Sequence, residues 1–159
     1  MNNNTDPLAQ RVVETLKRTR RTLATAESCT GGLLASRITD VSGASEVFGY
    51  GWVTYANEAK MTQLGVEPHL LESHGAVSEQ VAQAMAVGAR RIAKSDYAIA
   101  LTGVAGPNGG TPAKPVGTVF IALATVEGVQ VKKCFFSGER GEIKRLASDT
   151  ALEMLVAGS

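Results

Sequence analysis

A cluster of hydroxyl, thiol and carboxyl groups follows the first predicted strand of the chain. Residues 26–32 are Ala-Glu-Ser-Cys-Thr-Gly-Gly, and they lie between a buried strand predicted over 22–26 and a helix predicted over 33–38. A strand-to-helix turn presents its side chains at the carboxyl edge of a sheet, beside free backbone N–H groups at the positive end of the helix dipole. Ser28 is therefore a candidate nucleophile, and the N–H groups of Cys29 to Gly32 are candidate donors to an oxyanion.

A serine hydroxyl needs a base to remove its proton, and the two histidines of the chain do not follow predicted strands. Lys60 is the remaining candidate for this base. Residues 55–60, Tyr-Ala-Asn-Glu-Ala-Lys, follow a strand predicted over 47–55, so the Lys60 amine and the Tyr55 phenol could meet Ser28 at one sheet edge. To act as a base near neutral pH, the lysine pKa must fall by roughly three units from about 10.4, which desolvation can supply.

Simpler interpretations exist for the same residues. Ser28 and Thr30 could cap the following helix, although a buried carboxylate at Glu27 without a role would be costly. Lys60 could be a surface residue of a short helix, and Tyr55 could be the last core residue of its strand.

Three further polar residues also have two interpretations. Asn57 is suited to be a helix N-cap. Thr102 ends a strand predicted over 97–102, where it could fill the core or supply a site hydroxyl. Cys29 could replace Ser28 as the nucleophile, because a thiol at a helix N-terminus can be activated.

The segment 103–117 contains five glycines and three prolines between two predicted strands. Irregular loops of this length usually serve a site. Its glycine spacing fits neither a phosphate-binding P-loop nor the dinucleotide fingerprint. The segment could form a backbone nest for a phosphate or ribose beneath Lys114, or it could be a flexible connector. Arg140, ahead of the last predicted helix, is a candidate phosphate ligand or a solvated surface arginine.

The remaining pattern predicts an α/β fold in a single domain over 1–159, with residues 1–5 as a disordered tail. Asp6-Pro7 starts a helix that ends at the basic residues 17–21, and Glu127-Gly128 predicts an antiparallel hairpin that makes the sheet mixed. His69 and His74 are assigned to connecting loops. The other predicted helices cover 58–64, 78–94 and 141–156, and the other strands 118–125 and 129–136.

Composition narrows the function classes. The 159 residues are 44% hydrophobic with a net charge of +1 and no basic stripe, so nucleic acid is not expected as a partner. The two cysteines lack metal-ligand spacing, which favours reduced thiols, a cytoplasmic location and no metal site. No run of about 18 apolar residues predicts a membrane span.

Five ordered motifs together resemble the CinA C-terminal domain family, over nearly the whole chain. They are Ala-Glu-Ser-Cys-Thr-Gly-Gly at 26–32, Thr-Tyr-Ala-Asn-Glu-Ala-Lys at 54–60, Gly-Ala-Val-Ser at 75–78, Thr-Gly-Val-Ala-Gly-Pro-Asn-Gly-Gly at 102–110 and Lys-Pro-Val-Gly-Thr-Val at 114–119. The resemblance implies a three-layer α/β/α sandwich with a mixed, mostly parallel sheet. It also implies nicotinamide-nucleotide amidohydrolase activity, which converts nicotinamide mononucleotide to nicotinic acid mononucleotide and ammonia.

Site roles carried over by the motifs make Ser28 the nucleophile and Lys60 its base, assisted by Tyr55 and Thr102. No metal or cofactor is needed for this reaction, and a homo-oligomer is expected because family members commonly self-associate. Residues expected to contact substrate are Glu27, Cys29, Thr30, Gly31, Gly32, Asn57, Gly106, Gly109, Gly110, Lys114 and Arg140. The alternative is a non-catalytic nucleotide-binding or partner-binding module linked to competence or the DNA damage response.

Overall fold

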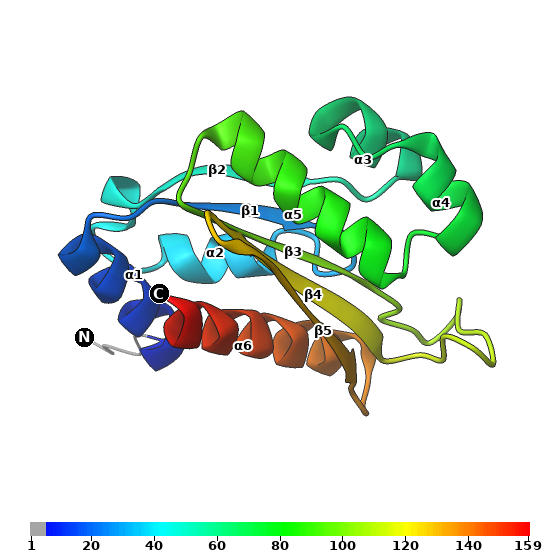
Figure 1. Ribbon diagram of the computed structural model, residues 1–159. Helices are drawn as coiled ribbons and strands as arrows, with labels where there is room; N and C mark the ends of the chain where they lie inside the picture. The colour runs from blue at the N-terminus through cyan, green and yellow to red at the C-terminus, as the bar shows by residue number, and fades with distance from the viewer. Residues whose placement is uncertain (1–5) are drawn as a thin grey trace.

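One mixed five-stranded sheet organises the chain in the computed structural model, which describes residues 6–159 (Figure 1). Its strands are β1 (Leu23–Glu27), β2 (Phe48–Val53), β3 (Tyr97–Gly103), β4 (Thr118–Thr125) and β5 (Gly128–Phe135), in the spatial order β2-β1-β3-β4-β5. β1 is parallel to β2 and β3, whereas β4 is antiparallel to β3 and β5. The predicted mixed sheet and terminal hairpin are confirmed. The tail predicted over 1–5 lies outside the described residues.

Helices cover both faces of the sheet, which confirms the three-layer sandwich (Figure 1). One face packs against α1 (Pro7–Thr19), α2 (Leu33–Thr39) and α6 (Arg140–Gly158). The other packs against α3 (Asn57–Leu64), α4 (Pro68–His74) and α5 (Glu79–Ala93). A short 3-10 helix, Ala44–Glu46, leads into β2.

The two faces of the sheet bury different side chains. Branched residues such as Leu23, Ile99 and Ile121 face α1, α2 and α6. The face toward α5 is made largely of alanines, namely Ala24, Ala26, Ala98, Ala100, Ala122 and Ala124. Small side chains allow a helix backbone to lie close to the strands, because less volume separates the layers.

Close packing of α5 also holds α3 in place. A Cβ added at Gly88 of α5 would lie 2.0 Å from the Leu64 carbonyl oxygen at the end of α3. Gly65 then ends α3 in the left-handed conformation, with φ of 72°, which glycine adopts without steric cost. The helix that carries Lys60 is therefore fixed at its far end against the core.

The prediction of loops around His69 and His74 is wrong, because both residues lie in α4. Pro68 occupies the first turn of this helix, and none of its residues is buried. In this seven-residue helix only Leu70 and Leu71 are partly buried against the core, which is too little to show the apolar periodicity by which a sequence reveals a helix.

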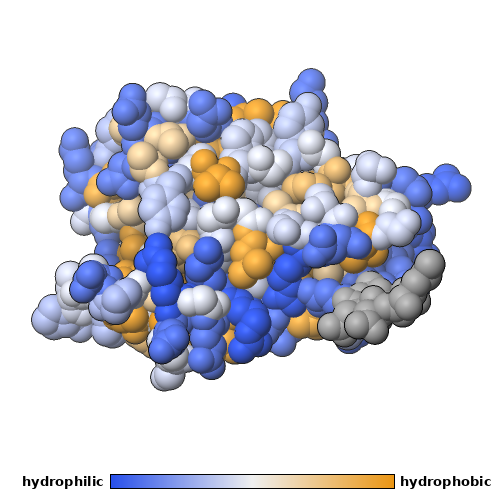
Figure 2. Space-filling model, turned by 180° about the vertical axis from the view of Figure 1, so that it is seen from behind, coloured by the Kyte–Doolittle hydropathy of each residue, from blue (hydrophilic) through white to orange (hydrophobic). Residues whose placement is uncertain are grey.

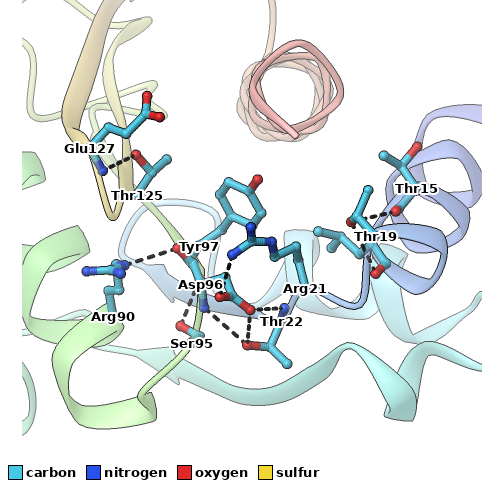
Figure 3. Close-up of polar contacts among 11 residues, drawn as sticks. Thr15, Thr19, Arg21, Thr22, Arg90, Ser95, Asp96, Tyr97, Thr125 and Glu127 are labelled. Atoms are coloured by element: carbon cyan, nitrogen blue, oxygen red, sulfur yellow. Dashed lines mark hydrogen bonds and ion pairs between the residues drawn. The ribbon is translucent and has the colours of Figure 1, made fainter.

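At the edge of the sheet where β1 and β3 begin, Asp96 forms a network of hydrogen bonds with Arg21 and Thr22 (Figure 3). Its carboxylate accepts hydrogen bonds from the Thr22 N–H at 2.8 Å and from Arg21 at 3.2 Å. Burial alone would raise the pKa of Asp96, but these hydrogen bonds outweigh it and lower the pKa. The network links the starts of two parallel strands, whose opposite ends carry the candidate site.

Candidate active site

The carboxyl ends of three parallel strands bring the candidate residues together. Ser28 directly follows β1, Thr54 and Tyr55 follow β2, and Thr102 lies near the end of β3. Backbone hydrogen bonds fix this junction, because the Ser28 N–H donates to the Leu101 oxygen and the Thr54 N–H donates to the Glu27 oxygen, each at 2.9 Å. The strand ends thus set the position of Ser28 before any side chain contributes.

Lys60 is buried and lies in contact with Ser28. Its Nζ is 3.0 Å from Ser28 Oγ, 2.7 Å from the Thr54 carbonyl oxygen and 3.2 Å from the Tyr55 carbonyl oxygen. The residue is only 1% exposed, so the interpretation of Lys60 as a surface residue is wrong. No carboxylate forms a salt bridge with this amine anywhere in residues 6–159.

Burial lowers the pKa of Lys60 below its ordinary value of 10.5, against an opposing effect of Cys29. The two backbone carbonyls determine how the amine is used. A neutral amine has two N–H donors and one lone pair. With the donors directed to the carbonyls of Thr54 and Tyr55, the lone pair is left for the Ser28 hydroxyl proton.

Glu27 caps α2, which corrects the interpretation of Ser28 and Thr30 as caps. The Glu27 carboxylate accepts hydrogen bonds from the Leu34 N–H at 2.9 Å and the Ala35 N–H at 3.1 Å, and the Thr30 hydroxyl donates to it at 2.7 Å. A carboxylate at this end of a helix also complements the helix dipole. Because Glu27 caps the helix, the Ser28 hydroxyl is not used for capping and contacts Lys60 instead.

Cys29 is a poor candidate for the nucleophile. Burial raises the pKa of its thiol to about 11, and the negative charge of Glu27 acts in the same direction. The thiol is therefore protonated near neutral pH, whereas the thiolate is the reactive form.

A cavity of about 300 Å³ opens at this edge of the sheet. All four residues predicted to be catalytic line it, together with Cys29, Gly106, Gly109 and Arg140 from the predicted substrate contacts. Arg140 crosses its mouth, since its guanidinium donates to the Gly106 carbonyl at 2.7 Å and to the Tyr55 hydroxyl at 2.8 Å. Tyr55 is 58% exposed, so it is not the last core residue of its strand.

Thr102 has a positioning contact in this cavity. Its hydroxyl donates to the Ala76 carbonyl at 2.9 Å, and the side chain is buried. The bond joins β3 to the segment before α5, so that Ala76 and Val77 form one wall of the cavity.

Seven residues predicted to contact substrate do not line this cavity, namely Glu27, Thr30, Gly31, Gly32, Asn57, Gly110 and Lys114. Lys114 instead donates to the His74 carbonyl at 2.5 Å. Asn57 is exposed in the first turn of α3, and the N-cap is Ala56 rather than Asn57. For Asn57 and Lys114 the outcome depends on side-chain direction, which the motifs do not specify.

Several lining residues were not singled out from the sequence: Ala76, Val77, Gly103, Val104, Ala105 and Asn108. Asn108 is a polar residue among glycines, and this pattern could have indicated from the sequence that it lies at the site. The other five lie inside the motifs at 75–78 and 102–110, but Ala, Val and Gly are common in every core and have no reactive group, so the motifs alone did not mark them as lining residues.

A larger cavity, of about 420 Å³, lies at the opposite edge of the sheet beside the β4–β5 turn. Arg21 and Asp96 in its lining are paired with each other (Figure 3). No Ser, Cys, Lys or His of the described residues lines this cavity, so its size alone does not make it the catalytic site.

Residues 6–159 contain no group of three or more His, Cys, Asp and Glu side chains that could hold a metal ion. Within the same range, no helix has the length and apolar character needed to cross a membrane.

The family model of the CinA C-terminal domain matches residues 5–158. This chain belongs to the CinA C-terminal domain family. A CinA-like protein of Desulfovibrio desulfuricans is 55% identical over 155 residues, which cover 96% of this chain and 36% of that protein. A CinA-like protein of Geobacter sulfurreducens is 59% identical over 134 residues, which cover 84% of this chain and 32% of that protein. The chain therefore spans about a third of the length of these CinA relatives.

Solved CinA structures share the fold over nearly their full length. The competence/damage inducible protein CihA from Agrobacterium tumefaciens has a TM-score of 0.92 and 43% identity, with 94% of this chain and 92% of that chain covered. A CinA superfamily protein from Klebsiella pneumoniae has a TM-score of 0.93 and 35% identity, with 98% and 97% covered. These names refer to competence and damage induction, and none states a reaction.

Proposed function

We propose that this CinA-family protein hydrolyses the carboxamide of nicotinamide mononucleotide to nicotinic acid mononucleotide and ammonia. Ser28 is the nucleophile and Lys60 its base. The observation that carries the proposal is the buried Lys60 amine, 3.0 Å from Ser28 Oγ, with two backbone carbonyls as its other partners. A general base needs contact with the proton it removes, and Lys60 Nζ makes that contact with the Ser28 hydroxyl.

The first half of the reaction forms an acyl-enzyme. Lys60 takes the Ser28 proton as Oγ bonds to the carboxamide carbon, and the carbonyl oxygen becomes an oxyanion. Cys29 lines the cavity and its N–H has no backbone acceptor within residues 6–159, so this N–H is available to the oxyanion. The C–N bond then breaks, and the Lys60 ammonium protonates the departing nitrogen to give ammonia.

The second half returns Ser28 to its starting state. A water molecule attacks the ester carbon while the neutral Lys60 amine accepts its proton. Cleavage of the bond from carbon to Ser28 Oγ releases the carboxylic acid, which loses its proton to solvent, and the Lys60 ammonium gives its proton to Oγ. One residue acts alternately as base and acid, which requires the lowered pKa that burial produces.

Arg140 is the proposed partner of the substrate phosphate. It is exposed at the cavity mouth, and its guanidinium already spans Gly106 and Tyr55. Guanidinium groups match phosphate oxygens in geometry and charge. A cavity of about 300 Å³ with one cation at the mouth and the nucleophile inside suits a small anionic amide.

Ammonia release from nicotinamide mononucleotide by the purified protein tests the proposal. We expect turnover by the parent protein and release of nicotinic acid mononucleotide in equal amount. If the nucleotide raises the melting temperature but no ammonia appears, the proposal fails and the non-catalytic binding module is favoured.

A further inference from the structure

Basic side chains gather at the end of the molecule opposite the candidate active site. α1 and α5 both end there, on opposite faces of the sheet, and segments 17–22 and 90–97 lead from these helices into β1 and β3 (Figure 1). The two segments are in contact, because β1 pairs with β3 and the Tyr97 N–H donates to the Thr22 carbonyl at 2.9 Å. We call this region the basic end, after its seven cationic side chains: Lys17, Arg18, Arg20, Arg21, Arg90, Arg91 and Lys94.

Acidic residues balance only part of the charge of the basic end. Its two segments contain seven of the 16 Lys and Arg residues of the chain and a single acid, Asp96, whereas the whole chain has 15 acids. Arg21 pairs with Asp96 and Lys17 pairs with Glu46, each at 3.2 Å. Within residues 6–159, no salt bridge involves the other five cations.

Helix dipoles do not account for these five cations. The C-terminal end of a helix carries about half a negative charge, so the ends of α1 and α5 offset about one cation. A surplus remains even when the exposed acids Asp40 and Glu127, near the same edge of the sheet, are counted. Charge is also unevenly spread elsewhere, since no charged residue occurs from 47 to 57, and the side on which β2 lies has pale and orange residues across its middle in Figure 2.

Two of the cations occupy backbone positions that glycine adopts most easily. Arg20 and Lys94 follow α1 and α5 in the left-handed conformation, with φ of 56° and 54°. Within residues 6–159 they are the only residues other than glycine with positive φ. Glycine is the usual residue at such helix ends, because it has no Cβ to clash. Both side chains are exposed and neither forms a salt bridge in the described chain, which favours a role toward an anion outside it.

The surface between the cations is hollowed. The β4–β5 turn has a cavity on either side, one of about 420 Å³ lined by Arg21 and one of about 310 Å³ lined by Arg90 and Arg91. Figure 3 shows Arg21 and Arg90 around this end of the sheet. Five of the seven cations are arginines, whose planar guanidinium binds phosphate oxygens with paired hydrogen bonds. Several cations bordering two hollows suit a chain of phosphates better than a single small anion or a flat bilayer.

We propose that the basic end binds the phosphate backbone of a nucleic acid without reading its sequence. Contacts of Arg and Lys with phosphates supply this kind of binding. The proposal departs from the expectation, based on composition, that nucleic acid is not a partner. The sequence shows no basic stripe because the cations belong to segments that meet only in the fold, as Arg21 and Asp96 do across 75 positions. The proposed amidohydrolase residues lie at the other edge of the sheet, so either proposal can fail alone.

Fluorescence anisotropy of a labelled DNA duplex of about 20 base pairs, titrated with the protein at about 50 mM to about 200 mM salt, measures this binding. We expect the parent to bind at low salt and to lose affinity as salt rises, because bound phosphates release counterions. Arg20→Gly with Lys94→Gly should weaken binding at low salt at least about tenfold and reduce the salt slope by about two. Glycine suits both backbone positions, so this double variant should stay folded.

The matched control is Lys133→Gln with Arg145→Gln, which removes the same charge from exposed residues outside the basic end and should change affinity by less than about threefold. Arg18→Gln with Arg91→Gln removes charge from the basic end at ordinary helical positions and should weaken binding as the glycine variant does. Circular dichroism must show each variant folded.

Two kinds of result would overturn the proposal. The first is a parent that leaves the anisotropy unchanged at low salt, or a control that loses as much affinity as the basic-end variants, since binding would then follow net charge alone. The second is tighter binding to vesicles of equal parts phosphatidylglycerol and phosphatidylcholine, or to polyglutamate, than to the duplex. Those outcomes would assign the basic end to a membrane surface or to an acidic protein.

Discussion

Lys60 Nζ lies 3.0 Å from Ser28 Oγ, although the two residues are 32 positions apart in the chain. The contact exists because β1 and β2 are parallel neighbours, so the segments that follow them begin at the same edge of the sheet. α3 then brings its first turn back over that edge, and the carbonyls of Thr54 and Tyr55 hold the amine. Sheet topology thus produces the pairing of nucleophile and base.

The rate of ammonia release should rise with pH as Lys60 loses its proton. Below the Lys60 pKa the amine is an ammonium and cannot accept the Ser28 proton, so kcat/KM is low. Because burial lowers this pKa, the midpoint should lie below 10.5, the ordinary value for lysine. A pH profile of kcat/KM measures it, and a rate that falls throughout the range from about pH 6 to about pH 9 would contradict the assignment.

The titration of Lys60 should also change the free energy of unfolding, which can be measured without any substrate. Between the lowered folded pKa of Lys60 and 10.5, the unfolded chain binds a proton that the folded chain does not, so the free energy of unfolding rises with pH. The increase is at most about 1.4 kcal/mol per pH unit. Urea titrations of the parent and Lys60→Met at several pH values isolate the contribution of Lys60 to the free energy of unfolding, because methionine does not titrate. If the difference in the free energy of unfolding between the parent and Lys60→Met is constant with pH, the pKa of Lys60 is not lowered by folding.

Glu27→Gln should destabilise the fold by about 2–3 kcal/mol, because the charged acceptor of three hydrogen bonds is lost and an NH₂ group faces donors. Urea denaturation measures the change. Glu79→Gln provides a control, as Glu79 is an exposed first-turn residue of α5 and should change stability by less than about 0.5 kcal/mol. Equal effects of the two substitutions would refute the capping role of Glu27.

Arg140→Gln should raise KM for nicotinamide mononucleotide about 10-fold to 100-fold and change kcat much less, as expected for the loss of a charge-assisted contact with a remote phosphate. Steady-state kinetics separate the two constants. Arg145→Gln removes a cation of the same helix whose partner is Asp149, and it should leave KM near the parent value. An Arg140→Gln enzyme with unchanged KM would remove Arg140 from substrate binding.

The sequence predicted the sheet edge better than it predicted the side chains around it. Buried strands followed by polar residues are visible in the pattern, and parallel pairing brings Ser28, Tyr55 and Thr102 to one edge. The direction of a long side chain depends on what surrounds it after folding. Lys114 was expected over the glycine-rich loop but bonds to the His74 carbonyl, a contact between segments 40 residues apart.

The alternative interpretation, in which Ser28 and Thr30 cap α2, is wrong for a related reason. Ser and Thr are the usual caps, and local sequence favours them. In the fold, β1 ends so that the Glu27 carboxylate reaches the N–H groups of Leu34 and Ala35, seven and eight residues onward. A contact over that distance depends on the path of the loop rather than on residue preference.

The most direct test compares Ser28→Ala with Cys29→Ala in the ammonia-release assay, beside Ser95→Ala as a buried serine at the opposite edge of the sheet. We predict that Ser28→Ala lowers kcat by at least about 10³-fold. Cys29→Ala and Ser95→Ala should stay within a few fold of the parent. Full turnover by Ser28→Ala, with activity lost in Cys29→Ala, would contradict the account and make the thiol the nucleophile.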